Sequence, residues 1–252
     1  MLRRFFLIVL CTFCSLNAFN LSAAGLKVGI SVEYPPLAYK QDGRIVGIEA
    51  DSLTAVGKIL GLKMTPVEMP FTRLITALEE GEIDVIMSGM SVTPERSERV
   101  QFLDPYLKIG QMAITTTSKV AQFAQPWAIY REGVRIGIEP GTTGAIFAER
   151  ELKDAELNFY TDPPAAFAGL RKDDIDLYIH DAPTSWLLAT NAENGDLISL
   201  YNPLTDESLA WAVRKDDQHV AKLLSSALAT MKSNGTLRYI LNRWIPVTVE
   251  VK

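Results

Sequence analysis

The sequence predicts an α/β fold built from two related halves. Short β-rich runs alternate along the chain with longer runs whose apolar residues recur at helical spacing. Two strings also occur twice: Lys27-Val28-Gly29-Ile30 returns as Arg135-Ile136-Gly137-Ile138, and Ile83-Asp84-Val85-Ile86 returns as Ile175-Asp176-Leu177-Tyr178. The alternative is that such simple strings resemble each other by chance. If the halves are related, their strand ends and helix starts flank a shared cleft, where small ligands usually bind.

The individual elements follow from the same patterns. β-rich runs bounded by turn residues predict strands at Lys27 to Ile30, Lys63 to Val67, Asp84 to Met87, Ile109 to Thr115, Arg135 to Ile138, Leu157 to Tyr160, Leu177 to His180 and Leu209 to Val213. Helical spacing and stop signals predict helices at Ser52 to Leu60, Thr72 to Glu80, Thr143 to Leu152, Ala182 to Thr190, Val220 to Met231 and Leu237 to Trp244. Two segments connect the halves, Ile109 to Thr116 and Ser208 to Arg214, and we expect the hinge there.

The beginning of the chain differs from the rest. Arg3 and Arg4 precede an apolar run that ends in small residues, so residues 1–24 are expected to be a cleavable secretory signal peptide. A membrane anchor needs about 20 continuous apolar residues, and polar residues interrupt this segment. No lipid anchor is expected, because neither Cys11 nor Cys14 follows the small residue that a lipobox requires.

The composition excludes several classes of function. Both cysteines lie in the leader, so the mature chain is expected to have no disulfide and no cysteine metal ligand. The 25 basic and 30 acidic side chains give a net charge of −5 without a basic cluster, which disfavours nucleic acid as a partner. His180 and His219 are the only histidines, so a histidine-based metal site or catalytic triad has little material.

The segment from Asp84 to Arg96 is typical of an anion-binding loop. An apolar strand runs into the small residues of Ser88 to Val92, Thr93 is a good N-cap, and Pro94 suits the first helical position. Backbone N–H groups can approach an anion there, and Arg96 can add a bidentate pair to a carboxylate or phosphate. The alternative is that Arg96 only pairs with a neighbouring glutamate on a solvated helix face.

Eight short motifs, taken in order along the chain, carry a more specific signal. They are Tyr34-Pro35-Pro36, Gly47 to Asp51, Gly81-Glu82-Ile83-Asp84, Ser88 to Arg96, Asp104-Pro105-Tyr106, Pro140-Gly141-Thr142-Thr143, Ile175 to Asp181 and Ser233-Asn234-Gly235-Thr236. With these motifs the chain resembles the amino-acid-type solute-binding proteins of ABC importers, bacterial solute-binding protein family 3. The resemblance covers nearly all of the mature chain.

This resemblance implies the periplasmic binding protein type II fold, in which two lobes close about a hinge on a ligand. The first lobe would comprise residues 25–113 and 208–252, and the second lobe residues 114–207. The implied function is to capture a polar amino acid, or a similar small zwitterion, in the periplasm and to deliver it to a membrane ABC permease. The protein is expected to be a monomer and a binding protein without a cofactor, and not an enzyme.

The resemblance also implies roles for particular residues. Arg96 would bind the α-carboxylate of the ligand with help from the Ser-Gly loop before it. Threonines at the start of a second-lobe helix would donate from the opposite wall, Asp181 would pair with the α-ammonium group, and two aromatic residues would flank the ligand side chain. The complete set of expected ligand-binding residues is Tyr34, Phe71, Ser88, Gly89, Ser91, Arg96, Thr142, Thr143 and Asp181.

Departures from the family pattern bear on the ligand. Members that bind cationic side chains tend to carry an acidic residue where this chain has Ser31, so lysine and arginine are disfavoured, although Glu33 or Glu49 could compensate. His180 beside Asp181 resembles the His-Asp pair of glutamine-binding members. A structural role for His180 is the alternative.

Two other functions fit the same resemblance. Periplasmic cyclohexadienyl (arogenate or prephenate) dehydratases share the Ser-Gly loop and its arginine, but they carry a carboxylate for acid catalysis where this chain has Gly144-Ala145 after Thr143. The third possibility is a ligand-sensing module that reports to a membrane receptor.

Overall fold

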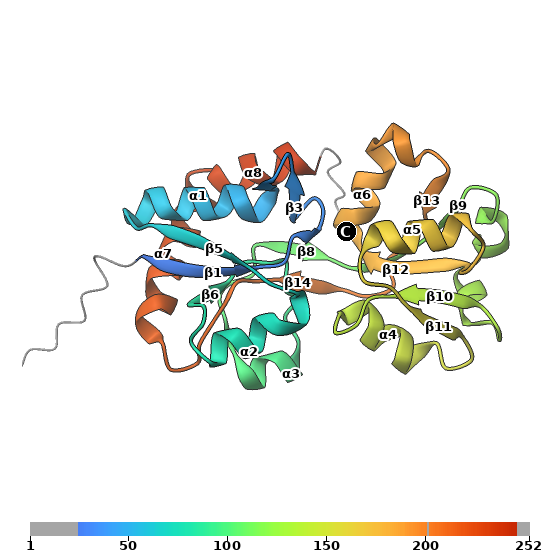
Figure 1. Cartoon of the computed structure of the whole chain (residues 1–252), viewed down its shortest axis with the longest axis horizontal. Coiled ribbons are helices and arrows are strands. Elements are labelled where there is room, and N and C mark those ends of the chain that lie inside the picture. The colour runs from blue at the N-terminus through green and yellow to red at the C-terminus, as the bar shows by residue number, and fades with distance from the viewer. Residues whose placement is uncertain (1–24, 201, 246–252) are drawn as a thin grey trace, which may run out of the picture.

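The chain forms two lobes placed side by side, in a computed structural model that describes residues 25–200 and 202–245 (Figure 1). Each lobe contains a five-stranded sheet with helices on both faces. This confirms the predicted two-lobed α/β fold. The predicted signal peptide at residues 1–24 and residues 246–252 of the predicted first lobe lie outside the described residues.

The sheet of the first lobe has the strand order β5-β1-β6-β15-β7. Its strands are β1 (Leu26–Ile30), β5 (Met64–Glu68), β6 (Val85–Ile86), β7 (Gln101–Phe102) and β15 (Ala212–Val213). One apolar cluster joins one sheet face to α1 (Ile48–Leu60), α7 (Gln218–Ser233) and α8 (Thr236–Trp244). On the other face lies α2 (Leu74–Glu79), which is tied to α3 (Pro94–Arg99) by the Arg99–Glu79 ion pair. The central strands are therefore buried on both faces, as their continuous apolar sequences require.

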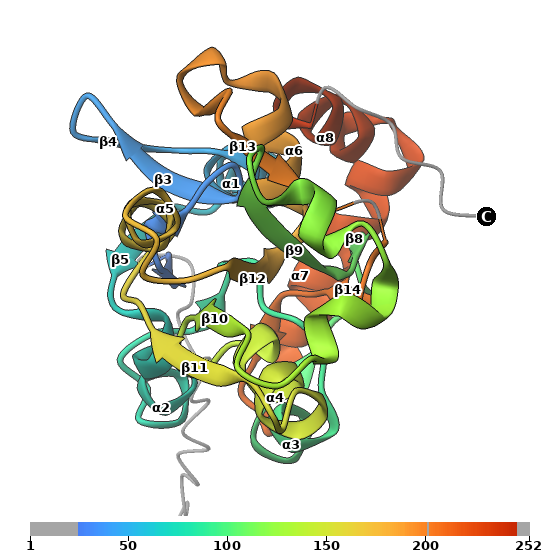
Figure 2. The ribbon, with the colours of Figure 1, turned by 90° about the vertical axis from the view of Figure 1, so that its right-hand side faces the viewer.

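The sheet of the second lobe has the strand order β11-β10-β12-β9-β13, and Figure 2 shows β11, β10 and β12 following one another across the sheet. The strands are β9 (Gln111–Thr116), β10 (Arg135–Ile138), β11 (Glu156–Phe159), β12 (Leu177–Asp181) and β13 (Leu197–Ser199). Helix α4 (Thr143–Glu151) packs on one face, while α5 (Pro163–Arg171) and α6 (Ala182–Thr190) pack on the other.

The repeated strings of the sequence make the same contacts between neighbouring strands in both lobes. We call this set of contacts the joint of the lobe. The Asp84 carboxylate accepts a hydrogen bond of 2.8 Å from the Lys27 N–H, and the Asp176 carboxylate accepts one of 3.0 Å from the Arg135 N–H. A Cβ atom added to Gly29 would lie 2.3 Å from Cδ1 of Ile83, and one added to Gly137 would lie 2.5 Å from Cδ1 of Ile175. The repeated strings therefore occupy equivalent positions and make equivalent contacts in the two lobes.

Two short strands connect the lobes as an antiparallel ribbon, visible between them in Figure 1. They are β8 (Leu107–Ile109) and β14 (Glu207–Leu209), and Glu207 pairs with Ile109. Both predicted connecting strands are therefore interrupted. The first one breaks at Gly110, where a Cβ atom would lie 2.2 Å from the backbone oxygen of Thr205.

The predicted boundary between residues 113 and 114 needs correction for the same reason. It falls inside β9, which pairs with β12 from Gln111 onward and so belongs entirely to the sheet of the second lobe. The chain leaves the first lobe earlier, through β8. A strand and its continuation in another sheet have the same apolar pattern, so the sequence alone merged them.

Other elements were missed or shifted. The small antiparallel sheet β2-β3-β4 (Glu33–Tyr34, Ala38–Gln41, Arg44–Val46), helix α5 and strand β13 were not predicted. Helix α1 begins at Ile48 and not at Ser52, and the predicted helix from Thr72 opens as a 3-10 turn, Phe71–Arg73, before α2. None of the described helices is long and apolar enough to cross a bilayer.

Candidate functional site

A cavity of about 380 Å³ lies between the lobes. The first lobe lines it with Ser31, Glu33, Tyr34, Pro70, Phe71, Thr72, Gly89, Ser91 and Arg96, and the second lobe with Gln111, Glu139, Pro140, Thr142, Thr143, Thr161, Ile179, His180 and Asp181. Eight of the nine residues expected from the sequence thus line one cavity. The ninth, Ser88, does not line it, because its hydroxyl accepts a hydrogen bond of 2.9 Å from the Ser31 N–H in the buried interior.

The loop after β6 is held in shape by a buried carboxylate. Gly89 has a φ of 62°, which favours glycine, and a Cβ atom there would lie 2.7 Å from the Tyr34 ring. The Gly89 N–H donates to Glu49 at 2.8 Å, and Glu49 also accepts from the hydroxyl of Tyr106 at 2.6 Å and the indole of Trp211 at 3.0 Å. Burial raises the pKa of Glu49, while these donors act to lower it. Glu49 is therefore a support of the loop and lies behind it.

Arg96 follows this loop in the first turn of α3. The Thr93 hydroxyl caps the helix by accepting from the Arg96 N–H at 3.1 Å. The guanidinium donates to the backbone oxygens of Ser91 at 2.8 Å and Gly141 at 3.0 Å, and it lies 5.4 Å from the centre of the Phe71 ring. Burial lowers the pKa of Arg96, although nearby carboxylates oppose this, and an arginine remains charged at neutral pH.

No carboxylate within residues 25–200 and 202–245 forms an ion pair with Arg96. Its contacts are two backbone oxygens and one ring, so the alternative in which Arg96 pairs with a neighbouring glutamate on its own helix is wrong. A buried guanidinium without a counter-ion carries a desolvation cost that an added anion would offset. The geometry can therefore bind a carboxylate or phosphate from the cavity.

The opposite wall begins at the N-terminus of α4. The Thr142 hydroxyl caps this helix, accepting from the Ala145 N–H at 3.1 Å and donating to the Glu139 backbone oxygen at 2.8 Å. The Thr143 hydroxyl accepts from the side-chain amide of Gln111 at 3.0 Å, which leaves its own proton free to donate. Of the two predicted threonines, Thr143 is thus the one with a donor left for a ligand.

Asp181 ends β12 and faces the cavity. The Tyr34 hydroxyl donates to one of its carboxylate oxygens and the Gln111 side-chain amide donates to the other. Burial raises the pKa of Asp181, and the neighbouring His180 and the bond from Tyr34 oppose the increase. No lysine or arginine in the described part of the chain forms an ion pair with Asp181, so this carboxylate can accept an ammonium group.

The hydrogen bonds that join the lobes around the cavity include three between described residues. They run from Tyr34 to Asp181, from Arg96 to the backbone oxygen of Gly141, and from the Thr184 hydroxyl to the backbone oxygen of Pro35 at 3.1 Å. Two of them involve side chains expected to bind the ligand. The same groups can therefore both close the cleft and hold what is inside it.

Two glutamates from different lobes line the cavity, and the charge of Glu139 acts on Glu33, so we refer to Glu33 and Glu139 as its acidic end. Glu139 accepts a hydrogen bond from the Tyr178 hydroxyl and lies 3.3 Å from Nε2 of His180. Burial acts to lower the pKa of His180, but the negative charges of Glu139 and Asp181 raise it above its ordinary value. Burial, and then the charges of Asp162 and Glu139, raise the pKa of Glu33.

Sequence reasoning missed Gln111 and Glu139 as residues of the site. Glu139 directly follows β10 and precedes the Gly-Thr-Thr loop, and strand ends of this kind commonly face a ligand cleft, so its position was an available signal. Gln111 follows Gly110 at the point where β8 gives way to β9. Its role depends on pairing between distant strands, which its neighbours in sequence do not reveal.

Comparison with known proteins agrees with this architecture. The profile of the bacterial extracellular solute-binding proteins, family 3, matches residues 26–247. The ABC transporter arginine-binding protein 1 of Escherichia coli is 30% identical over 247 residues, which is 95% of this chain and 98% of the relative. The cyclohexadienyl dehydratase of Pseudomonas aeruginosa is 25% identical over 226 residues, or 89% of this chain and 84% of the relative.

A solved structure of another protein has a similar fold. It is that of an ancestral amino-acid-binding protein described as a precursor of cyclohexadienyl dehydratase, which superposes with a TM-score of 0.83 at 27% identity over 90% of this chain and 97% of the other. Sequence and fold therefore agree over almost the whole described chain.

Proposed function

The chain belongs to family 3 of the bacterial extracellular solute-binding proteins, and on that premise we propose that its cavity binds one α-amino acid. One observation carries the proposal. A buried guanidinium, Arg96, and a partly buried carboxylate, Asp181, line one cavity from opposite lobes, and neither forms an ion pair with a described residue of opposite charge. A zwitterion supplies the missing partner of each.

We assign the α-carboxylate of the ligand to Arg96, with the hydroxyls of Ser91 and Thr143 as further donors. The α-ammonium group is assigned to Asp181, which Tyr34 and Gln111 hold in place. Phe71 packs against the Arg96 guanidinium and forms an apolar wall beside it. Ser88 is assigned a supporting role, because its hydroxyl is already bonded to Ser31.

The proposed setting is the periplasm. There the protein acts as a monomer after removal of its signal peptide and delivers its ligand to a membrane ABC permease. We propose that β8 and β14 form the hinge between one lobe, residues 25–106 and 210–245, and the other lobe, residues 111–200 and 202–206. Deletion of the gene should abolish high-affinity uptake of the ligand, and unchanged uptake with loss of a response would favour the sensing role.

The second candidate function is dehydration of prephenate or arogenate, because one relative is a cyclohexadienyl dehydratase. The position after Thr143 argues against it. Gly144 occupies this position, and a Cβ atom there would lie 2.8 Å from the Gln111 side-chain oxygen, so a catalytic carboxylate does not fit without a rearrangement. Incubation of the purified protein with prephenate and arogenate tests this directly, and formation of phenylpyruvate or phenylalanine would establish the enzyme.

A thermal-shift screen of the twenty amino acids tests the main proposal. A ligand at one hundred times its Kd adds about 2.7 kcal/mol to the free energy of unfolding, so one amino acid or a few should raise the melting temperature clearly. Arg96→Ala and Asp181→Asn should each abolish the shift. The matched controls are Arg99→Ala, on the same helix but paired with Glu79 at the surface, and Asp196→Asn, exposed in the second lobe. Normal binding by both site variants would refute the assignment.

A further inference from the structure

We propose that the bound amino acid carries a cationic side chain, and that this cation lies between Glu33 of the first lobe and Glu139 of the second. The inference rests on the proposed function, because it takes Arg96 and Asp181 as the partners of the α-carboxylate and α-ammonium groups. It assigns the acidic end of the cavity to the side chain of the ligand, because the α-carboxylate and α-ammonium groups bind elsewhere.

Glu139 is held in one orientation by groups of its own lobe. Tyr178 donates a hydrogen bond to Oε1, and Nε2 of His180 lies 3.3 Å from the same oxygen. The Glu139 side chain is 15% exposed and lines the cavity, so it presents a fixed, largely buried carboxylate to a ligand. Such a preorganised acceptor binds a cation with little loss of side-chain entropy.

Glu33 approaches the same region from the other lobe. It lies in β2, directly before Tyr34, and its side chain is exposed at the edge of the cavity. Burial raises the pKa of Glu33, and the charges of Asp162 and then of Glu139 raise it further, so Glu139 is near enough to act on Glu33 from the other lobe. A cation between them removes this repulsion and adds an attraction that favours closure of the lobes.

The charges that line the cavity are unequal. Arg96 is the one guanidinium among the described lining residues, whereas Glu33, Glu139 and Asp181 supply three carboxylates. Even with His180 protonated, negative charges outnumber positive ones. A ligand with a neutral side chain adds one charge of each sign and leaves this surplus in place, which is costly where the carboxylates are buried, as at Glu139. A ligand with one additional positive charge offsets it.

This inference reverses the expectation drawn from Ser31. The sequence disfavoured lysine and arginine because an acidic residue is missing there, with Glu33 or Glu49 as compensating candidates. Glu49 is bonded to Gly89, Tyr106 and Trp211 behind the loop and does not line the cavity. Glu33 does, and Glu139 supplies the second carboxylate from a strand end that the sequence did not single out.

Titration calorimetry with matched ligands tests the inference. L-Arginine and L-citrulline have nearly the same shape and differ in side-chain charge, and L-lysine, L-glutamine and L-glutamate extend the comparison. Arginine or lysine should bind at least about tenfold more tightly than citrulline or glutamine, since hydrogen bonds to charged groups contribute about 1.5–3 kcal/mol.

Two variants locate the effect. Glu139→Gln should weaken binding of the cationic ligand about tenfold or more and change citrulline binding little, because only the charge of the acceptor is lost. Glu33→Gln, at an exposed position that cannot disturb the core, should weaken it in the same direction. Glu132→Gln, an exposed glutamate of the second lobe away from the cavity, is the matched control and should leave binding unchanged.

The outcomes separate this inference from the proposed function. Preference for a neutral or acidic amino acid would overturn the cationic assignment and leave the amino-acid site intact. Equal losses for arginine and citrulline in both Glu139→Gln and Glu33→Gln would also overturn it. If none of the twenty amino acids binds, the proposed function and this inference fail together.

Discussion

The two lobes contain the same joint, but they place opposite charges at the cavity. In each lobe a repeated string places an aspartate, Asp84 or Asp176, where it accepts a hydrogen bond from a backbone N–H near the start of β1 or β10. Beyond this joint, β6 leads into the loop that positions Arg96, whereas β12 leads directly to Asp181. The repetition therefore explains the scaffold of the lobes, while the residues after the repeated strings determine which end of a zwitterion each lobe binds.

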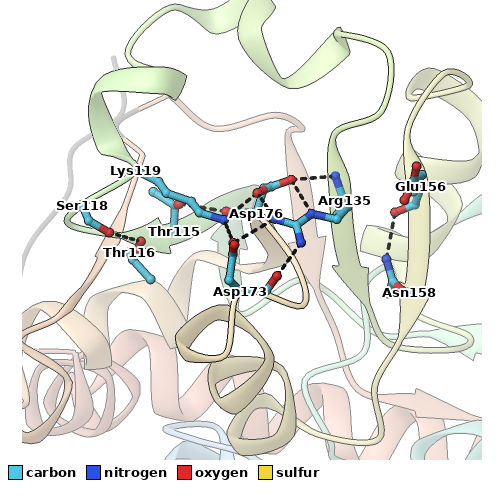
Figure 3. Close-up of polar contacts among 9 residues, drawn as sticks. All are labelled: Thr115, Thr116, Ser118, Lys119, Arg135, Glu156, Asn158, Asp173 and Asp176. Carbon is cyan, nitrogen blue, oxygen red and sulfur yellow. Dashed lines mark hydrogen bonds and ion pairs between the residues drawn. The ribbon is translucent and has the colours of Figure 1, made fainter.

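The joint itself is reinforced differently in the two lobes. In the second lobe, Asp176 accepts from Arg135 Nη2 at 2.7 Å and Nε at 3.0 Å and from the Lys119 ammonium group at 2.6 Å, with Asp173 beside them (Figure 3). In the first lobe, Asp84 has the Arg214 guanidinium at 3.4 Å. The second lobe thus has a denser network of ion pairs at the equivalent place.

The largest loss of stability should come from substitution of Glu49, which supports the loop before Arg96 in the first lobe. Glu49→Ala leaves three buried donors, on Gly89, Tyr106 and Trp211, without an acceptor, so we expect a loss of about 3–5 kcal/mol in the free energy of unfolding. Glu49→Gln should cost less, because its amide oxygen still accepts. Chemical denaturation measures both, and a loss below about 1 kcal/mol for Glu49→Ala would show that the loop does not depend on this carboxylate.

The next comparison concerns the two joint aspartates. Asp176→Asn should destabilise the protein by about 2 kcal/mol and Asp84→Asn by about 1 kcal/mol, because the charged hydrogen bonds of Asp176 are shorter and more numerous. Denaturant unfolding at pH 7 measures the difference. Equal losses would mean that the ion pairs around Asp176 add nothing to the shared backbone bond.

Asp176 also predicts that the stability of the protein depends on pH. Hydrogen bonds from Arg135 and Lys119 outweigh burial and hold the pKa of Asp176 well below its usual range. Because the folded pKa lies below the unfolded one, about 3.9, the stabilisation is fully present above about pH 5 and is lost as the pH falls toward the folded pKa. Acid unfolding of Asp176→Asn should therefore depend less steeply on pH below about 4 than that of the unmodified protein. Identical acid profiles would contradict this.

The smallest effect is expected at the turn before each joint. Gly81 has a φ of 74°, and Asp173 holds the equivalent position with a φ of 61°. Asp173→Gly relieves a left-handed non-glycine residue but removes exposed ion pairs to Lys119 and Arg135, so the two effects oppose each other and the net change in stability should be small. Gly81→Asp meets no steric obstacle and should cost about 1 kcal/mol, as measured by thermal unfolding. A larger loss in Asp173→Gly would assign the ion pairs a stabilising role.

Local chemistry explains which parts could be predicted from the sequence. The Thr93 cap, Pro94 and the small residues before them act over a few positions, so the loop and Arg96 were recognisable. Helix α5 carried a comparable signal that was missed: Asp162 caps it, and two prolines occupy its first positions. The Asp42-Gly43 pair, with φ values of 51° and 74°, likewise indicates the turn between β3 and β4.

The parts that escaped prediction depend on contacts between distant segments. Whether the run after Leu107 stays in one sheet or changes lobe is decided by its pairing with β14 and β12, some 70 to 100 positions away. Gln111 and Glu139 acquire their places at the cavity through the same long-range arrangement. A single sequence contains the residues but not the pairing that brings them together.

The ribbon of β8 and β14 limits how the lobes can move. Two strands that are hydrogen-bonded to each other, with Gly110 packed against the backbone of Thr205, restrain sliding of one connection past the other far more than bending of both together. We expect opening and closing to follow essentially one rotational coordinate, so that a single distance between labels on the two lobes would describe the whole transition.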